Sequence, residues 1–306
     1  MINELVRRIV IVVAGVLIAC APASGQQIAD PGFNVRVDNP SYTKNFPRLL
    51  FDEAHNNFHT ATGRYKPFAD LIFSDGYQIN VNRKPFTKES LRTHKVLVIA
   101  NALGAEDLDE EGAELPAFTE AEVKAVHDWV RGGGALLLIA DHAPFGGAAE
   151  TLAKQFGVSM SKGFVRDPEH SDRDAPGRLI FSRENKLLLD HSITNGRSDT
   201  ERVNRVLTFT GQALKGPEGS VEFMKLGPAA VDVPSREATT NVPVGGQAQG
   251  LAFKFGKGRV VVMGEAAMLS AQLTGPQRLP MGMNVSGSDN RQLALNIMHW
   301  LSGLLK

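Results

Sequence analysis

FTEAEVKAVHDWVRGGGALLLIADH, residues 118–142, has the clearest secondary-structure pattern in the chain. Three valines recur there at helical spacing, and Thr119 with Glu122 matches the capping-box pattern, so residues 119–131 are expected to form a helix. Three glycines then stop that helix. The apolar run 135–140 that follows is typical of a strand covered on both faces.

The same alternation extends outward from this unit. A second helix is expected at 148–156, and further buried strands at 48–51, 95–100 and 259–263. A last helix is expected at 289–305. Between about residues 160 and 250 the pattern is less regular and indicates strands that pair antiparallel at the edge of the sheet. The pattern predicts one α/β domain over residues 26–306, a flavodoxin-like three-layer sandwich whose mostly parallel sheet has helices on both faces.

The first 25 residues are expected to be an export signal, because a basic start is followed by an apolar run and small residues. The only cysteine, Cys20, ends the segment LIAC at 17–20, which is similar to a bacterial lipobox. Two outcomes stay open: lipid attachment at Cys20, or cleavage after Ser24 or Gly25. We therefore expect an exported protein that is periplasmic, secreted or lipid-anchored, with membrane contact only through that anchor.

Composition excludes several classes of function. Basic and acidic residues number 33 each, so the net charge is zero and no nucleic-acid partner is indicated. No cysteine follows Cys20, which excludes a disulfide, a thiolate nucleophile and a thiolate metal site from the mature domain. The sequence does not indicate an oligomeric state, and the expected partner is a small-molecule substrate.

Polar side chains follow four of the expected strands. The richest group is FDEAHNNFHT, residues 51–60, directly behind the first strand. Ligands of open α/β sheets bind beyond the carboxyl ends of the strands, so these loops are expected to build one site. The strand-end residues are Asp52, His55, Asn56, His59, Asn101, Asp141, His142 and Glu265.

Histidine and carboxylate side chains together suit a divalent metal ion, with zinc the best match and manganese or calcium as alternatives. The expected ligands are His55, Asp141 and His142. Glu265 or Asp52 would act as the general base, because a bound ion lowers the pKa of its water to about 7. The residues expected to bind substrate are Asn56, Asn101 and His59.

Three segments together resemble a known group of proteins. They are residues 118–142, DHSITNG at 190–196 and GRVVVMGE at 258–265, and they resemble the DUF4350 and GldG/ThuA-like group with the class I glutamine amidotransferase-like fold. The resemblance covers about residues 45–305. It implies a flavodoxin-like sandwich with a strand-end cleft, and a structural role for His191. Amidotransferases of this fold use a cysteine after a central strand, where this chain has Asp141 and His142.

Two functions from different classes follow. The first is an exported, divalent-metal-dependent hydrolase of a small ester, lactone or sugar derivative. The second is a non-catalytic envelope binding module that holds a sugar or peptide with Asn56, Asn101, Asp141 and Glu265. Clustering of histidine and carboxylate at strand ends favours the enzyme, whereas the fold alone does not choose between them.

Overall fold

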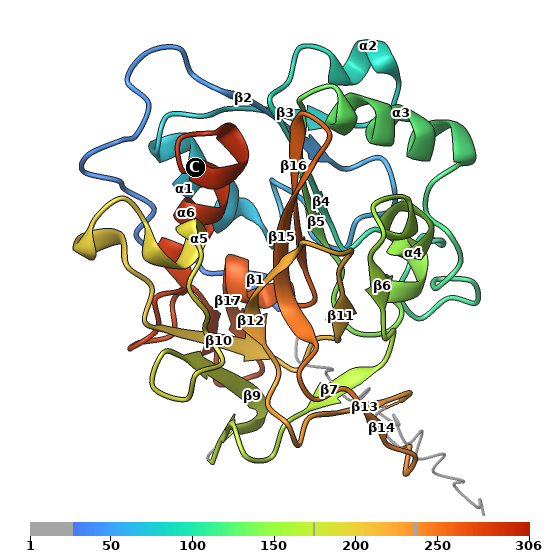
Figure 1. The fold of residues 1–306 in the computed structure, drawn as a ribbon, viewed down its shortest axis with the longest axis vertical. Helices are drawn as coiled ribbons and strands as arrows, with labels where there is room; N and C mark the ends of the chain where they lie inside the picture. The colour runs from blue at the N-terminus through green and yellow to red at the C-terminus, as the bar shows by residue number, and fades with distance from the viewer. Residues whose placement is uncertain (1–26, 174, 236–237) are drawn as a thin grey trace, which may run out of the picture.

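The computed structural model describes residues 27–306 except 174, 236 and 237, and a nine-stranded sheet forms its centre (Figure 1). The expected export signal and Cys20 lie outside the described residues. Five neighbouring strands of the sheet run parallel. In spatial order they are β3 (Gln78–Asn82), β2 (Arg48–Asp52), β4 (Val96–Ala100), β5 (Ala135–Ile139) and β16 (Gly258–Met263).

The other part of the sheet is antiparallel. It begins with β15 (Ala248–Phe255), which pairs antiparallel with β16. It continues with β11 (Leu214–Lys215), β6 (Ser159–Met160) and β12 (Val221–Lys225). The α/β class expected from the sequence is confirmed, but the sheet is mixed rather than mostly parallel, because the excursion through the middle of the chain adds antiparallel strands to its edge.

Helices cover both faces of the sheet (Figure 1). On one face lie α1 (Lys66–Ser74) and α6 (Asn290–Ser302), with the short α5 (Ser192–Asn195) against α6. On the other lie α3 (Glu120–Arg131) and α4 (Phe145–Gln155), with α2 (Lys88–Leu91) against α3. Successive residues of a strand point into the hydrophobic cores on opposite faces of the sheet. Leu49 and Phe51 lie in one core and Leu50 lies in the other. Burial on both faces explains why these strands are continuously apolar.

The segment that predicted the fold forms the structure expected of it. Helix α3 is preceded by Thr119, whose N–H donates to Glu122 Oε2 at 3.0 Å while its own hydroxyl accepts from Glu122 N. The glycines end α3, and β5 follows at Ala135. Helix α4 begins three residues earlier than expected, at Phe145.

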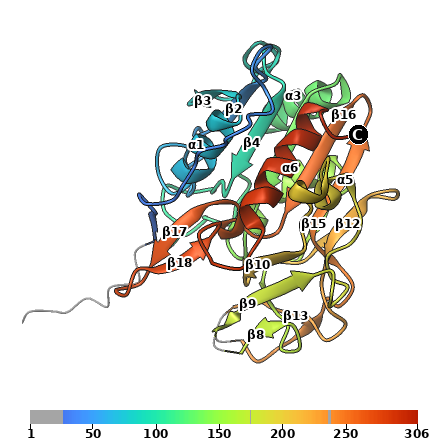
Figure 2. The same cartoon turned by 90° about the vertical axis from the view of Figure 1, so that its left-hand side faces the viewer.

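Three small antiparallel sheets gather at the end of the central sheet where its parallel strands finish (Figure 2). They consist of β1 (Ile28–Ala29), β17 (Ala271–Thr274) and β18 (Leu279–Gly282); β8 (Ser171–Asp172), β9 (Ala175–Ser182) and β10 (Arg205–Phe209); and β7 (Phe164–Arg166), β13 (Val231–Val233) and β14 (Val242–Pro243). Two 3-10 turns, η1 (Asp199–Glu201) and η2 (Ala267–Leu269), complete the described structure. No helix in the described part of the chain is long and apolar enough to span a bilayer.

Candidate functional site

Four strand ends meet at the carboxyl edge of the central sheet. Parallel pairing places the ends of β2, β4, β5 and β16 along one edge. Asp52 is the last residue of β2, and Asn101, Asp141 and Glu265 follow the other three strands. The chain order also reverses here, because β3 lies on one side of β2 and β4 on the other. Ligands of open α/β sheets bind at such a reversal, so the edge is the first place to look for a site.

The polar stretch after β2 divides into two parts, and His55 belongs to the first. Its Nδ1 lies 2.8 Å from Asp52 Oδ2 and its Nε2 lies 2.8 Å from Glu122 Oε1. The ring packs against Phe86 and Phe118. Burial lowers the pKa of His55, but the two carboxylates outweigh it and leave that pKa raised. Asp52, His55 and Glu122, which we call the His55 clamp, fasten the loop after β2 to α3.

The His55 clamp bears on the expected metal site. Both ring nitrogens of His55 are hydrogen bonded, so this side chain can bind an ion only after one of those bonds breaks. Among the described residues, no three or more histidine, cysteine or acidic side chains are arranged to hold a metal ion. His55, Asp141 and His142 are therefore not brought together as a ligand set. Glu122, which the sequence indicated only as a helix cap, is the clamp's unexpected member.

Asn101, Asp141 and Glu265 form a second polar group. Asn101 has a left-handed backbone (φ 50°), and its Oδ1 accepts a hydrogen bond from Asp141 N at 3.0 Å. Glu265 is fully buried, and its carboxylate accepts hydrogen bonds from the backbone N–H groups of Ala267 and Met268 in η2, at 2.7 and 2.8 Å. Burial raises the pKa of Glu265 well above its ordinary value, and the charge of Asp141 raises it further. Two carboxyl groups thus interact at adjacent strand ends.

His59, the second part of the polar stretch, joins this group. Its neighbour Phe58 donates its N–H to Asn101 O at 2.9 Å, and Gln272 Nε2 lies 3.5 Å from His59 Nε2. The ring of Tyr65 packs on His59, and burial together with Glu265 and Asp141 raises the pKa of that tyrosine. We call His59, Asn101, Asp141, Glu265 and Gln272 the strand-end cluster. Three side-chain contacts link its members in pairs: His59 with Gln272, Asn101 with Asp141, and Asp141 with Glu265.

Three members of the strand-end cluster have a buried polar atom without a hydrogen-bond partner. These atoms are His59 Nδ1, Asn101 Nδ2 and Gln272 Oε1, on side chains at most 2% exposed. Burial lowers the pKa of His59 to about 3, and Arg64 lowers it further, so the imidazole is neutral at physiological pH. Buried polar atoms in folded proteins nearly always have partners, so each exception needs an explanation.

Of the other two residues expected in the site, Asn56 lies outside the cluster and His142 lies at its margin, with its Nε2 3.9 Å from Asp141 Oδ1. Asn56 is exposed, with a left-handed backbone (φ 48°) that turns it outward, while the adjacent Asn57 is buried and accepts from His55 N. His142 stacks on Phe164 with ring centroids 4.4 Å apart, and its Nδ1 lies 2.7 Å from Ala143 O. Gln272 was not expected, because it arrives from β17, a strand of a separate small sheet.

A cavity of about 580 Å³ lies between β7, the turn at β8 and β13. Phe164, which stacks on His142, forms part of its wall. Thr210 forms another part, and the next residue, Gly211, lies so close to Glu265 that an added Cβ would be 2.9 Å from the Cβ of that glutamate. The volume is in the range of small-molecule sites.

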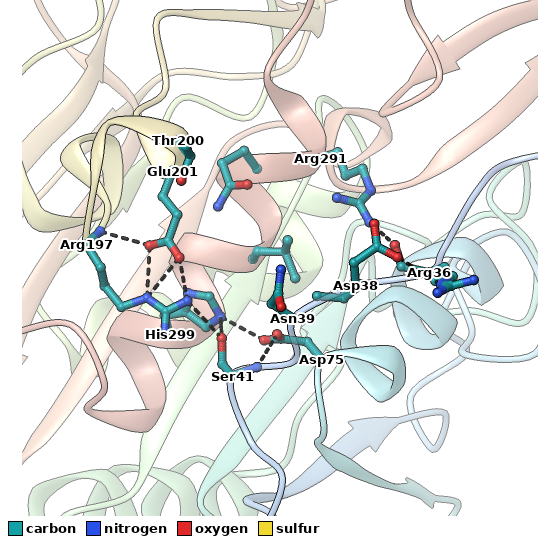
Figure 3. A pocket seen from close by; sticks show the side chains of 13 residues that line it. Arg36, Asp38, Asn39, Ser41, Asp75, Arg197, Thr200, Glu201, Arg291 and His299 are labelled. Atoms are coloured by element: carbon teal, nitrogen blue, oxygen red, sulfur yellow. Dashed lines mark hydrogen bonds and ion pairs between the residues drawn. The ribbon is translucent and has the colours of Figure 1, made fainter.

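A smaller polar pocket of about 210 Å³ runs along α6, between residues 36–41 and 197–201 (Figure 3). Ser41, His299 and Asp75 meet in it, which is the composition of a hydrolytic triad. However, Ser41 Oγ at 2.9 Å and Asp75 Oδ2 at 2.7 Å both contact the same nitrogen, His299 Nε2, whereas a triad needs opposite nitrogens. Asp75 also accepts from Ser41 N, so the three side chains hold the N-terminal segment against α1 and α6.

No family model matches this chain, and no curated protein does. Solved structures do match. The mmIFT52 N-terminal domain superposes with a TM-score of 0.58 at 16% identity, covering 84% of this chain and 97% of that one. A cytoplasmic protein from Salmonella typhimurium LT2 gives 0.51 at 15% identity, covering 84% and 99%. The likeness is one of fold.

The structural neighbours also include ThuA-like proteins. One from Bacteroides uniformis has a TM-score of 0.45 at 12% identity, covering 89% of this chain and 95% of that one. A likeness at that TM-score is too distant to indicate a shared site.

Proposed function

We propose that this chain binds a small polar molecule at the strand-end cluster. The observation behind the proposal is the set of three buried polar atoms without partners on His59, Asn101 and Gln272. A ligand group that pairs with them would remove the desolvation cost of about 1–3 kcal/mol that each unsatisfied group brings. Thr210, in the wall of the cavity of about 580 Å³, precedes Gly211, which lies against Glu265, and we propose that the rest of the ligand occupies this cavity.

A sugar or a peptide suits this arrangement. The unsatisfied atoms belong to a neutral imidazole and two carboxamides, which recognise ligands through hydrogen bonds rather than ion pairs. Asn101, Asp141 and Glu265 keep the binding role that the sequence suggested for a non-catalytic module, while His59 and Gln272 replace Asn56. The fold is compatible with a binding module, but the fold alone does not identify a function.

Calorimetric titration of the full chain with neutral monosaccharides and with short peptides tests the proposal. We expect saturable binding to a member of one panel, loss of that binding in Gln272→Ala, and retention in Gln292→Ala. Gln292 is the matched control because it lines the separate pocket along α6. Absence of binding from both panels, or equal binding by both variants, would refute the proposal.

A hydrolase is the second candidate, and Asp141 beside Glu265 is the observation that favours it. Glu265 holds its proton to higher pH than an ordinary glutamate, because it is buried and close to Asp141. A carboxyl group that stays protonated beside a second carboxyl group is a typical acid–base arrangement. Asp52, the other base expected from the sequence, is instead engaged by His55 in the clamp. Turnover of esters and lactones by the wild type, lost in Asp141→Asn, is the expected result for an enzyme.

The divalent ion remains part of this second proposal, with zinc, manganese or calcium as the candidates. The described side chains are not arranged to coordinate this ion, because His55, one of the three expected ligands, has both ring nitrogens bonded in the His55 clamp. Elemental analysis of the full chain purified without chelator, beside His142→Ala, tests the site directly. About one ion per chain, lost in the variant, would show that His142 is a ligand and that the clamp opens to admit the metal.

We also propose export, with lipid attachment at Cys20 or cleavage after Ser24 or Gly25, and a flavodoxin-like, amidotransferase-like assignment of the fold. The order of the parallel strands supports that assignment: numbered along the chain it is 2-1-3-4-5. Intact-mass analysis of the protein from the producing cell distinguishes the two N-termini, because only the lipoprotein begins at a modified Cys20.

A further inference from the structure

The cavity of about 580 Å³ lies between two of the small antiparallel sheets and is lined by charged as well as apolar residues. Strands β7 and β13 line it from one sheet, and β8 and β9 line it from the other. Its charged residues are two arginines and two aspartates: Arg166, Arg173, Asp167 and Asp172. Since the two signs are equal in number, the charge that the cavity attracts depends on which of these groups the protein already engages.

Groups of the protein hold both aspartates. Asp167 is 2% exposed, and its Oδ2 accepts a hydrogen bond from Gly227 N at 3.1 Å and lies 3.0 Å from His170 Nδ1. Asp172 Oδ2 accepts a hydrogen bond from Arg178 Nη1 at 3.1 Å. Arg178 has a positive charge of its own, so it compensates the charge of Asp172. A cationic ligand would therefore have to compete with these groups for the two carboxylates.

The arginines leave positive charge at the cavity. Arg173 directly follows β8, is exposed, and forms no hydrogen bond or ion pair with another described residue. Arg166 is the last residue of β7, so each of the two sheets contributes an arginine to the wall. With Arg178 included, three arginines accompany two aspartates here, and a guanidinium group stays protonated at physiological pH. An anionic group is thus the charged partner that this wall favours.

Apolar side chains form another part of the wall: Phe164, Val165, Pro168 and Val231. A guanidinium group can donate two parallel hydrogen bonds to one carboxylate, while apolar surface covers the rest of a small molecule. We infer that this cavity binds the carboxylate group of a small organic acid, with Arg173 as its principal donor. The inference rests on the proposed function in taking the cavity as a ligand site, and it adds the chemical class of the ligand part that lies there.

An acidic sugar and the C-terminus of a peptide both supply such a carboxylate. D-Glucuronate and N-acetyl-L-leucine are the probes for these two sources, and D-glucuronamide and N-acetyl-L-leucinamide are neutral controls of the same shape. In calorimetric titration of the full chain, we expect one acid to bind about tenfold or more tightly than its amide, and that acid identifies the source. Equal binding of acid and amide, or binding by neither acid, would overturn the inference.

Two substitutions in the cavity wall locate the bound carboxylate. Arg173→Gln removes the charge of an exposed side chain, so we expect wild-type thermal stability and an affinity for the acid that falls to that of its amide. Arg92→Gln, at an exposed arginine at the end of α2, is the matched control and should bind as the wild type does.

Gly177→Leu should fill the cavity. A Cβ added at Gly177 would lie in open space 3.5 Å from Thr210 Oγ1, and both residues line the wall. We expect this variant to lose binding of the acid and of the amide alike. Wild-type affinity for the acid in Arg173→Gln or in Gly177→Leu would overturn the inference.

Gln272→Ala distinguishes failure of the inference from failure of the proposed function. Acid binding that is lost in Arg173→Gln but retained in Gln272→Ala would support the cavity site and refute binding at the strand-end cluster. Binding of a neutral sugar or peptide that is lost in Gln272→Ala, without a preference for either acid, would support the proposed function and refute the inference.

Discussion

Two histidines four residues apart, His55 and His59, have opposite surroundings. Each ring nitrogen of His55 lies 2.8 Å from a carboxylate oxygen, and the net effect raises its pKa. His59 is buried, its Nδ1 has no partner, and burial together with the charge of Arg64 lowers its pKa to about 3. The sequence presents the two as equivalent strand-end ligands, whereas the structure gives them different tasks.

The difference separates polar groups that hold the fold from polar groups that we propose to bind a ligand. In the His55 clamp, hydrogen bonds satisfy the imidazole, and Glu122 also receives N–H groups from Thr119 and Phe86. A network of that kind rigidifies a core. The strand-end cluster leaves three buried atoms unsatisfied, a destabilising arrangement that the proposed ligand would relieve.

Removal of the clamp's centre should have the largest effect. In His55→Ala, Asp52 and Glu122 are left as buried carboxylates without their shared cation, so we expect a loss of about 3–5 kcal/mol in the free energy of unfolding. Urea denaturation measures it. The control is Asn56→Gly, at an exposed left-handed position that glycine adopts easily, where little change is expected. A loss below 1 kcal/mol in His55→Ala would contradict a structural role for the clamp.

Local patterns explain which parts of the fold the sequence predicted. The capping box at Thr119 and Glu122, the glycine stop and the apolar strand β5 all depend on neighbours within a few residues, and all were expected. Strand β3 was missed because it lies at the sheet edge and alternates in polarity, QINVN, instead of forming an apolar run. The three small sheets depend on pairing between distant segments, which local periodicity does not reveal.

The candidate site shows the same limit. The strand-end rule found Asn101, Asp141 and Glu265, because the position after a buried parallel strand is visible in the sequence. It failed to separate His55 from His59, since the partner that claims His55 is Glu122, 67 residues away. It also missed Gln272, which lies in β17 and contacts His59 although the two residues are 213 positions apart in the sequence. Contacts of this kind depend on the tertiary arrangement of elements whose own patterns are unremarkable.

A comparison of two buried glutamates should give the next largest effect. The pKa of Glu122 is lowered, because hydrogen bonds from Thr119, His55 and Phe86 favour its charged form more than burial opposes it. The pKa of Glu265 is raised, because burial and Asp141 favour its neutral form. We expect Glu122→Gln to lose about 1–3 kcal/mol of unfolding free energy at pH 7, and Glu265→Gln to lose much less. Equal losses would mean that Glu265 is also held as a charged structural group.

The most direct comparison of the two histidines is the slope of stability with pH. His59 has its pKa lowered from 6.5 to about 3, so from pH 6.5 down to about 3 only the unfolded chain binds its proton, and stability falls as pH falls. His55 has its pKa raised, so its contribution is complete below pH 6.5 and is lost as pH rises through the folded pKa. Each slope is at most about 1.4 kcal/mol per pH unit.

Urea denaturation between pH 4 and pH 8 should therefore separate the two residues. His59→Gln should flatten the acidic side of the stability profile, whereas His55→Gln should flatten the alkaline side. His191, whose burial lowers its pKa to about 4, adds to the acidic slope, so His191→Gln is the control that measures its share. Equal acidic slopes in the wild type and in His59→Gln would show that His59 is not held neutral. The imidazole would then be a cation in the folded chain, and the contrast between the two histidines would fail.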